Sequence, residues 1–187
     1  MIRSKPKEIM KSSWFWESIR AENVLLFGGN GALCANANTS VSDFLQWDYV
    51  GTPWSQYHGQ GGDGSTHSFR HRSAMLSILQ NHSPQDHEPD YQFFVKYLIQ
   101  DGFQVADQPT TIHFGGVTDF DRAPFLVSGT QATLNWTLRE NLLAVCPEVK
   151  MIFPSMHEPA CFGAHPDPAK CQQSICALRK VIPPQGC

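Results

Sequence analysis

The sequence predicts one α/β domain over residues 1–187, because short apolar runs of strand length alternate with amphipathic segments of helix length. The chain has 187 residues, of which 41% are hydrophobic, enough for one ordinary core. Residues 1–22 form a polar N-terminal extension in which we expect a short helix ending near Arg20. Proline and cysteine dominate residues 155–187, so we expect a loop-rich tail there.

Strands are expected where short apolar runs end at turn-forming residues. Residues 24–27 ("VLLF") are followed by two glycines, and residues 48–51 ("DYVG") stop at "GTPW". Three more strand candidates are "FQVAD" at 103–107, "TTIHFGG" at 110–116 and "VKMIFP" at 149–154. The glycine-rich residues 55–66 ("SQYHGQGGDGST") are expected to form a loop.

Four segments carry helix signals. Ser40 with Asp43 resembles a capping box before a short helix, and apolar residues from Phe69 to Leu79 suit one side of a second helix. The strongest helical period lies in "YQFFVKYLIQDG", which Gly102 closes. The amphipathic "LNWTLRENLLAVCP" is expected to be a helix that ends before Pro147.

Charge and hydropathy narrow the classes of partner. The formal net charge of −3 gives no indication of a basic surface that would bind nucleic acid, so no nucleic-acid partner is expected. No run approaches the ~20 apolar residues that span a bilayer, so no membrane span is expected.

The compartment is suggested by sequons and cysteines. Three N-x-[ST] sequons begin at Asn38, Asn81 and Asn135, and five of the six cysteines lie between residues 146 and 187. Together they suit a secretory or Golgi lumen. Residues 1–20 lack the apolar core of a signal peptide, so a lumenal protein implies a further N-terminal part. In the cytosol all six cysteines would be free thiols instead.

The stretch "VLLFGGNGALC" raises the question of dinucleotide binding. A strand followed by Gly29 and Gly31 matches the start of the pyrophosphate-binding fingerprint, but Cys34 stands where the third glycine is wanted. The following "CANANTS" disfavours a helix, although Asp48 lies about 20 residues on, where a ribose-binding acid would sit. This interpretation requires a helix directly after Gly31.

A longer series of motifs runs along the chain in order. The first block is "NVLLFGGNGALCANANTSVSDFLQWDYVGTPW", and the blocks "GGDGSTHSFRHRSAML", "EPDYQFF" and "CPEVKMI" follow. Together they resemble an uncharacterised family of glycosyltransferase-like domains that is common in fungi. The first block follows the family's strand, cysteine–asparagine and D-F-L-x-x-D-Y-[VI]-G-x-P-W elements in order. The resemblance covers about residues 14–165, and the ordered series is more specific than the GGNG loop alone.

The resemblance implies the later part of a GT-A-type glycosyltransferase, with a mixed sheet flanked by helices. Too few residues precede Val24 to form the usual N-terminal nucleotide-binding strands. In the family a carboxylate holds Mn²⁺ or Mg²⁺ on the donor diphosphate, and Asn30 stands at that position. The implied metal ligands are therefore Asn30, Asp48 and His165, while Ser128 occupies the place of the family's late histidine.

The resemblance also implies a set of site residues. The donor-binding residues would be Asp48, Asp63, Gly62, Gly64, Arg70 and Arg72. Asp90 would be the catalytic base that deprotonates an acceptor hydroxyl, with Glu88 as the alternative base. The residues alone also fit plain structural roles, with Asp90 as a helix cap, Asp63 in a tight turn and one of the two arginines structural.

Three functions are therefore open. The first is transfer of a sugar from a nucleotide-sugar donor to a hydroxyl acceptor. The second is a non-catalytic or truncated glycosyltransferase-like domain that binds sugar or nucleotide without turnover. The third is a dinucleotide-binding oxidoreductase.

Histidines and the C-terminal cysteines leave further interpretations open. His67 and His71 have the i, i+4 spacing of half a metal site, whereas His113 suits a satisfied buried histidine. A zinc site in the tail would use Cys161, His165, Cys171 and Cys176. In an oxidising compartment the plausible disulfides are instead Cys171–Cys176 and Cys146–Cys161.

Overall fold

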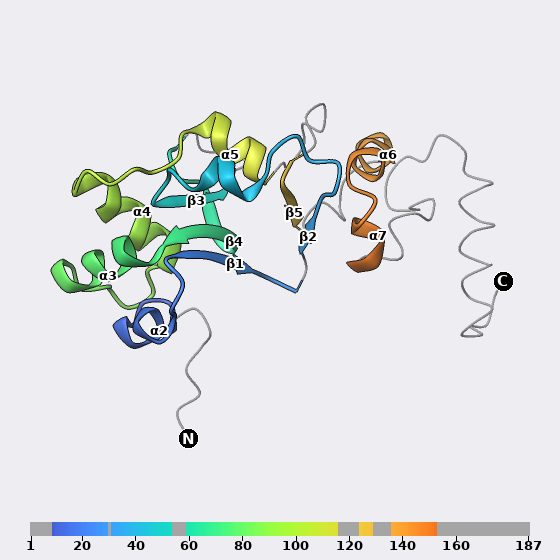
Figure 1. Cartoon of the computed structure of the whole chain (residues 1–187). Coiled ribbons are helices and arrows are strands. Elements are labelled where there is room, and N and C mark those ends of the chain that lie inside the picture. The colour runs from blue at the N-terminus through green and yellow to red at the C-terminus, as the bar shows by residue number, and fades with distance from the viewer. Residues whose placement is uncertain (1–8, 30, 54–58, 116–123, 129–135, 153–187) are drawn as a thin grey trace, which may run out of the picture.

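The computed structural model describes residues 9–29, 31–53, 59–115, 124–128 and 136–152 (Figure 1). This part of the chain is mixed α/β. Its elements in order are α2 (Ser13–Ser18), β1 (Asn23–Phe27), β2 (Gly31–Leu33), the 3₁₀ helix η1 (Val41–Phe44), β3 (Tyr49–Thr52), β4 (Asp63–His71), α3 (Arg72–Asn81), α4 (Asp90–Gln100), α5 (Gln108–Phe114), β5 (Leu126–Ser128), α6 (Trp136–Val145) and α7 (Val149–Ile152). The expected tail at 155–187 lies outside the described residues.

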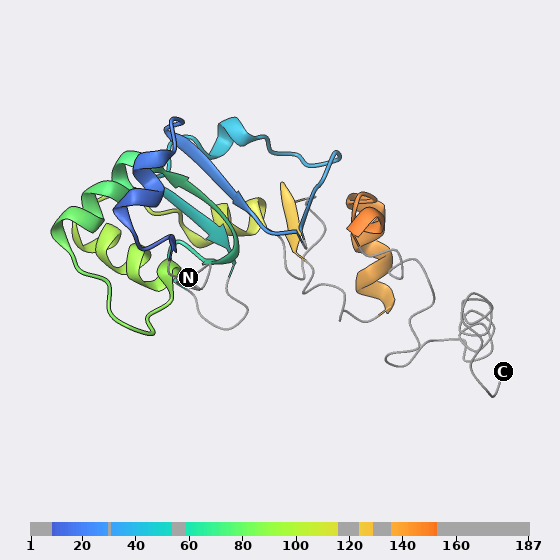
Figure 2. The same ribbon diagram turned by 90° about the horizontal axis from the view of Figure 1, so that it is seen from below.

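The larger sheet has three strands in the order β1–β4–β3, and both strand pairs are antiparallel (Figure 1, Figure 2). A register shift between Gly51 and Thr52 lets Thr52 face Asp63, and such irregularities bend a strand. Among the described residues the parallel pairs are two isolated bridges, one of them between Tyr49 and Val105. The mixed sheet expected from the GT-A resemblance is therefore wrong, because every described strand pairing is antiparallel.

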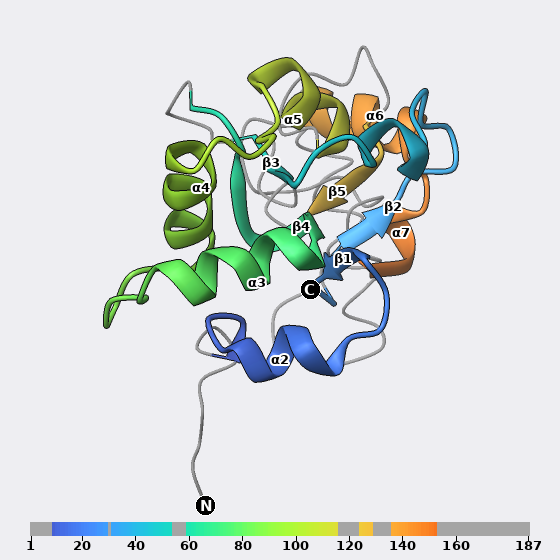
Figure 3. The ribbon, with the colours of Figure 1, turned by 60° about the vertical axis from the view of Figure 1, so that its left-hand side comes forward.

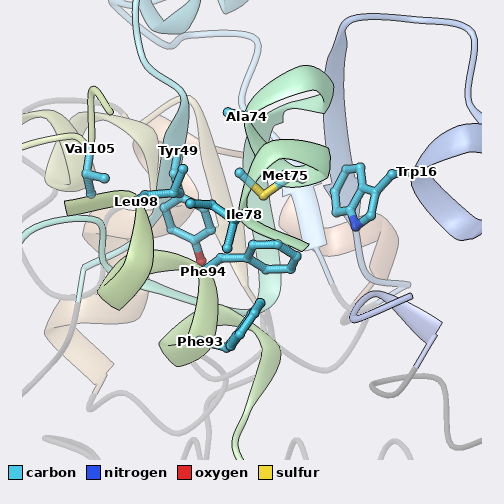
Figure 4. Packing of buried hydrophobic residues seen from close by; sticks show 9 residues of the cluster. All are labelled: Trp16, Tyr49, Ala74, Met75, Ile78, Phe93, Phe94, Leu98 and Val105. Carbon is cyan, nitrogen blue, oxygen red and sulfur yellow. The ribbon is translucent and has the colours of Figure 1, made fainter. Parts of the chain in front are cut away.

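Side chains alternate across this sheet, so both of its faces carry a core. Tyr49 belongs to a cluster with Trp16 and residues of α3 and α4, the helices that cover one face (Figure 3, Figure 4). The neighbouring Val50 joins a second cluster that includes Phe44 of η1 and Phe114 of α5. Apolar residues of these strands therefore pack on both faces, while the buried polar residues His67, Ser68 and Arg70 of β4 need partners within the fold.

A smaller core lies beside the main sheet (Figure 1). There β2 pairs antiparallel with β5, and its buried residues include Ala32, Val127 and Leu142. The last two described helices, α6 and α7, complete this core. No described helix is long and apolar enough to cross a membrane.

Several local signals predicted their elements correctly. β1 contains the predicted strand at 24–27, and β3 is shifted by one residue from the predicted strand at 48–51. The 3₁₀ helix η1 begins with the Ser40–Asp43 capping box. α4 ends as expected, with Gly102 at a φ of 79° just beyond the helix. α6 ends at Val145, before Pro147.

Five local predictions were wrong because a nearby residue or a tertiary partner outweighed the apolar pattern. In the strand predicted at 110–116, residues 110–114 are helical, since Asp107 caps α5 and Pro109 suits its first turn. Residues 149–152 form the helix α7, and residues 103–107 contribute one bridge at Val105 rather than a strand. The predicted loop at 55–66 gives way to β4 from Asp63 onward. Phe69, which was predicted to lie in a helix, is part of the strand β4.

Gly62 is expected to tolerate a side chain poorly. Its φ is 71°, and a Cβ there would overlap the carbonyl oxygen of Thr52. We expect Gly62→Ala to lower the free energy of unfolding by about 3 kcal/mol, from backbone strain plus crowding of a fixed backbone atom. Urea denaturation of the purified variant measures this loss.

Two other glycines provide matched controls for that substitution. Gly102 has a similar φ of 79° but open space around it, so Gly102→Ala should lose about 1 kcal/mol from strain alone. Gly59 has open space and no positive φ, so Gly59→Ala should change stability by less than about 0.5 kcal/mol. Equal losses at Gly62 and Gly102 would show that crowding by Thr52 contributes nothing.

Asp107 gives α5 a pH-dependent cap. Its carboxylate accepts a hydrogen bond from Thr110 N at 2.9 Å, and hydrogen bonding to the side chain and then to the backbone of Thr110 holds the pKa of Asp107 below its usual value. We expect Asp107→Ala to lower the free energy of unfolding by about 1 kcal/mol at neutral pH. Because the folded pKa is depressed, the cap is fully present above about pH 4 and is lost as the pH falls through the folded pKa.

Urea denaturation of the wild type and of Asp107→Ala at neutral and acidic pH measures this effect. The difference between their free energies of unfolding should become smaller in acid. Asp107→Asn is the control, since an amide oxygen still caps the helix but does not titrate in this range. A gap between wild type and Asp107→Ala that stays constant in acid would contradict the prediction.

Candidate functional site

A buried ion pair joins the central strand to the start of α4. Arg70 Nη2 donates to Asp90 Oδ2 at 2.6 Å, and the two side chains are 0% and 1% exposed. Arg70 Nε also donates to Ser68 Oγ at 2.8 Å. Charges this deeply buried are rare in proteins unless they are paired, because burial removes their hydration. Asp90 also lies in the first turn of α4, where the helix dipole favours a negative charge.

Three aromatic rings surround the Arg70 guanidinium. Its Cζ lies 5.1 Å from the centroid of Tyr49, 5.4 Å from Phe94 and 5.9 Å from Trp16. Tyr49 and Arg70 are direct cross-strand partners on β3 and β4. Rings at these distances attract a cation through their quadrupoles, so they stabilise the buried charge.

Two polar atoms of this centre have no hydrogen-bond partner among the described residues. They are Tyr49 Oη and Arg70 Nη1, and both are buried. Burial raises the pKa of the Tyr49 hydroxyl, so Tyr49 keeps its proton and offers a donor rather than a base. Buried polar atoms nearly always find a partner, in the protein, in water or in a ligand. These two atoms therefore mark the centre as the strongest candidate site in the described chain.

The glycine-rich segment 59–64 ends directly against this centre. A Cβ on Gly64 would overlap the Tyr49 hydroxyl and would lie 3.0 Å from Arg70 Nη2, so only glycine allows the backbone this close. The half-buried Asp63 accepts from Ser65 N at 2.7 Å through Oδ1. The structure thus brings the predicted donor-binding residue Gly64 against Arg70, which pairs with the predicted base Asp90, while Gly62 lies against the backbone of Thr52.

Asp48 is not part of this group. It immediately precedes Tyr49 at the start of β3, but its Oδ1 is 3.0 Å from His71 Nδ1 and its Oδ2 accepts from Gln104 N at 2.8 Å. Both oxygens of its carboxylate thus hold protein partners. The observed role of Asp48 is to join β3, the end of β4 and the segment after α4.

The remaining predicted residues are spread around the centre. Arg72 begins α3, is 26% exposed at its side chain and donates from Nε to the Trp16 carbonyl at 2.8 Å. Of the two arginines, Arg70 is thus the buried one. Glu88 is half-buried two residues before Asp90, and its carbonyl accepts from Lys11 Nζ at 2.9 Å.

The predicted metal half-site at His67 and His71 is wrong. Both residues lie on β4, and four residues along a strand separate them by about 13 Å, whereas the same spacing on a helix would bring them together. His113 is half-buried on α5. Within the described ranges, no three His, Cys, Asp or Glu side chains gather as metal ligands would. Asn30 and His165 lie outside the described residues.

The cysteine pairing differs from the expected one. Cys34 and Cys146 form a disulfide with a Cα–Cα distance of 4.7 Å, so the proposed Cys146–Cys161 bond is wrong. The two cysteines are 112 residues apart, and only the packing of β2 against the end of α6 brings them together. The tail cysteines of the zinc and Cys171–Cys176 hypotheses lie outside the described residues.

The loop after β1 also departs from a dinucleotide fingerprint. The element that follows it is the strand β2, beginning at Gly31, and not the helix that pyrophosphate binding requires. Gly31 is close to the His67 ring, where a Cβ would overlap the imidazole. The glycine at this position is therefore explained by packing against β4.

Sequence reasoning missed the three aromatic members of the centre, Tyr49, Phe94 and Trp16. Tyr49 lies in a predicted strand, but its partner Arg70 follows Phe69, from which a helix was predicted. The signal that was available is the alternation of Ser68 and Arg70, which places two polar side chains on one face of an extended chain.

Comparison with other proteins gives a family without a known activity. No curated protein and no solved structure matches the chain. A family model does match residues 3–125, a span that includes the glycine segment and the Arg70–Asp90 pair but ends before Cys146. Because this span is well over half of the sequence, the chain belongs to the family described as "Protein of unknown function (DUF5672)".

Proposed function

We propose that the chain is a glycosyltransferase-like domain that binds a nucleotide-sugar donor at the glycine-rich segment 59–64. The observation that carries this proposal is the position of Gly64 against a buried cation, Arg70, whose Nη1 has no partner in the described chain. Because Arg70 is 0% exposed, a donor anion reaches it only if the residues that cover it move apart on binding. A donor diphosphate is an anion, and arginine is the side chain best suited to bind it. The motif resemblance over residues 14–165 supports the same class of ligand.

Asp63 is the donor-binding residue that we propose to contact the sugar or ribose. Its carboxylate is half-buried, whereas Gly62 and Gly64 on either side are buried. One oxygen already accepts from Ser65 N, which orients the group and leaves the second oxygen for a ligand hydroxyl. Thr52 Oγ1 donates to the Asp63 carbonyl at 2.9 Å and holds the backbone in place.

The position of Asp90 favours a second candidate, which is binding without turnover. A general base must reach the proton it removes, but Asp90 is 1% exposed and already pairs with Arg70. Glu88 is closer to solvent and is the alternative base in an active enzyme. If neither acts on an acceptor hydroxyl, the domain retains donor binding alone.

A divalent cation is not well supported by the described side chains. Asp48 has both carboxylate oxygens engaged with His71 and Gln104, so it does not fit a hard-cation ligand in this arrangement. Asn30 and His165 would have to supply the site from outside the described residues. The proposed donor binding does not require a metal ion, and its dependence on Mn²⁺ is to be measured.

The test is calorimetric titration of UDP and GDP into the purified full chain, with and without Mn²⁺. We expect one nucleotide to bind, and Asp63→Ala to weaken it at least 10-fold. Asp63→Asn keeps an oxygen that accepts the hydrogen bond from Ser65 N but removes the negative charge. It therefore distinguishes loss of loop structure from loss of charge, and it should weaken nucleotide binding less than Asp63→Ala does. Asp86→Ala, in the exposed loop before α4, is the matched control and should bind like the wild type.

The outcomes separate the candidates. Binding followed by sugar transfer or donor hydrolysis supports the enzyme, and Glu88→Gln or Asp90→Asn then identifies the base. Binding with neither reaction supports the non-catalytic domain. If neither nucleotide binds with or without Mn²⁺, both candidates are wrong for this chain.

A further inference from the structure

We propose that Asn38 is a site of N-linked glycosylation in an oxidising secretory lumen. The acceptor sequence is Asn38-Thr39-Ser40, in which the middle residue is not proline and the third carries a hydroxyl. This proposal is independent of the donor site and of any catalytic activity of the chain.

The fold presents Asn38 to solvent. Residues 34–40 connect β2 to η1, and Asn38 is exposed in a bend of this connection. No hydrogen bond ties its side chain to the described residues, so the amide nitrogen that would carry a sugar is open to solvent. An exposed loop is where a bulky hydrophilic group is accommodated without loss of packing.

Both ends of this connection are held in place. At one end Ala37 N donates to the Cys34 carbonyl at 3.1 Å, and Cys34 is bonded to Cys146. At the other end Ser40 N donates to Asp43 Oδ2 at 2.7 Å in the capping box of η1. The exposure of Asn38 is thus a property of the folded chain and is set by the two anchors.

The Cys34–Cys146 disulfide is the independent observation that points to the compartment. Both cysteines are buried, at 6% and 0% exposure, within the core that β2 and α6 share. Disulfides of this structural kind form and persist in the secretory lumen and are rare in the cytosol. The lumen is also where a polyprenyl-diphosphate oligosaccharide is available as glycan donor.

The chemical step adds one bond to the side chain. Asn38 Nδ2 attacks C1 of the first sugar of the lipid-linked oligosaccharide, and a new Nδ2–C1 bond forms as the bond from C1 to the diphosphate oxygen breaks. The polyprenyl diphosphate leaves with the electron pair, and one Nδ2 proton passes to a base of the transferase. No oxidation or reduction occurs.

The other described sequon is a weaker acceptor. Asn81 is the last residue of α3, and its Nδ2 donates to the Ser77 carbonyl at 3.0 Å, so the nitrogen that would carry the sugar is engaged with the helix. The sequon at Asn135 lies outside the described residues.

The experiment uses the full chain isolated from its source cells. An aliquot is treated with peptide:N-glycosidase in ¹⁸O-water, which converts a glycosylated asparagine to an aspartate that carries one heavy oxygen, and is then digested for mass spectrometry. We expect a heavy aspartate at position 38 in the treated sample and no peptide with a bare Asn38 in the untreated one. A linked Cys34–Cys146 peptide is expected in both.

Sequon variants expressed in the same cells provide the controls. Asn38→Gln and Ser40→Ala should each lose the glycan, whereas Ser40→Thr keeps both the acceptor sequence and a capping hydroxyl and should retain it. Recovery of unmodified Asn38 from most wild-type copies would overturn the proposal. So would heavy oxygen at Asn81 without any at Asn38.

Discussion

Asp90→Ala is expected to lower the free energy of unfolding by about 3–5 kcal/mol, because it leaves the Arg70 guanidinium buried without its counter-charge. Arg70 is 0% exposed, so it cannot recover hydration without opening the contact between β4 and α4. The aromatic rings around it compensate only in part, since a cation–π contact contributes about 0.5–2 kcal/mol. Urea denaturation followed by tryptophan fluorescence measures the change, and Trp16 lies close enough to report on this centre.

Two comparisons isolate the ion pair. Asp86→Ala, in the exposed loop before α4, should change stability by less than about 0.5 kcal/mol. The double variant Arg70→Met with Asp90→Leu removes both charges together and should recover most of the loss, because well-packed apolar residues often replace a buried pair without destabilisation. A loss below about 1 kcal/mol in Asp90→Ala would show that the pair is not coupled in solution.

The same double variant separates stability from binding. If it folds as expected, nucleotide titration into it tests Arg70 without the complication of an unfolded protein. Under the proposed function we expect the folded double variant to bind the nucleotide at least 10-fold more weakly than the wild type. Unchanged affinity would remove Arg70 from the binding site and leave it a purely structural residue.

Removal of the Cys34–Cys146 disulfide is expected to lower the free energy of unfolding by about 2–4 kcal/mol. The bond closes a loop with a sequence separation of 112 residues, so its loss gives the unfolded chain much more conformational freedom. It also ties the end of β2 to the end of α6 within the smaller core. The measurement is urea denaturation of the variant with Cys34→Ala and Cys146→Ala.

Reductant distinguishes this bond from any that the C-terminal cysteines form. Added to the wild type, it should lower the denaturation midpoint toward that of the double variant. Any change that reductant causes in the denaturation midpoint of the double variant comes from other disulfides of the chain. A wild-type midpoint that reductant does not move, together with a stable double variant, would contradict the assigned role of this bond.

Local sequence signals determined those elements whose cause lies within a few residues. The capping box at Ser40 and Asp43, the period of α4 and its closing Gly102 act through contacts between near neighbours. Such interactions are the same in any fold, so their pattern can be read from the sequence. The motif series likewise placed the chain among uncharacterised domains, and the match to a family of unknown function over residues 3–125 agrees with that coarse statement.

Only the tertiary structure decided the candidate site and the sheet. β4 was divided between the predicted loop at 55–66 and the predicted helix from Phe69, because its polar residues His67, Ser68 and Arg70 hid the strand. Their burial becomes favourable only when Asp90, Tyr49 and the flanking strands supply partners. The Cys34–Cys146 bond has the same origin, because no short-range rule links residues so far apart in the chain. Pairing energies of this kind depend on distances in space, which a one-dimensional pattern does not contain.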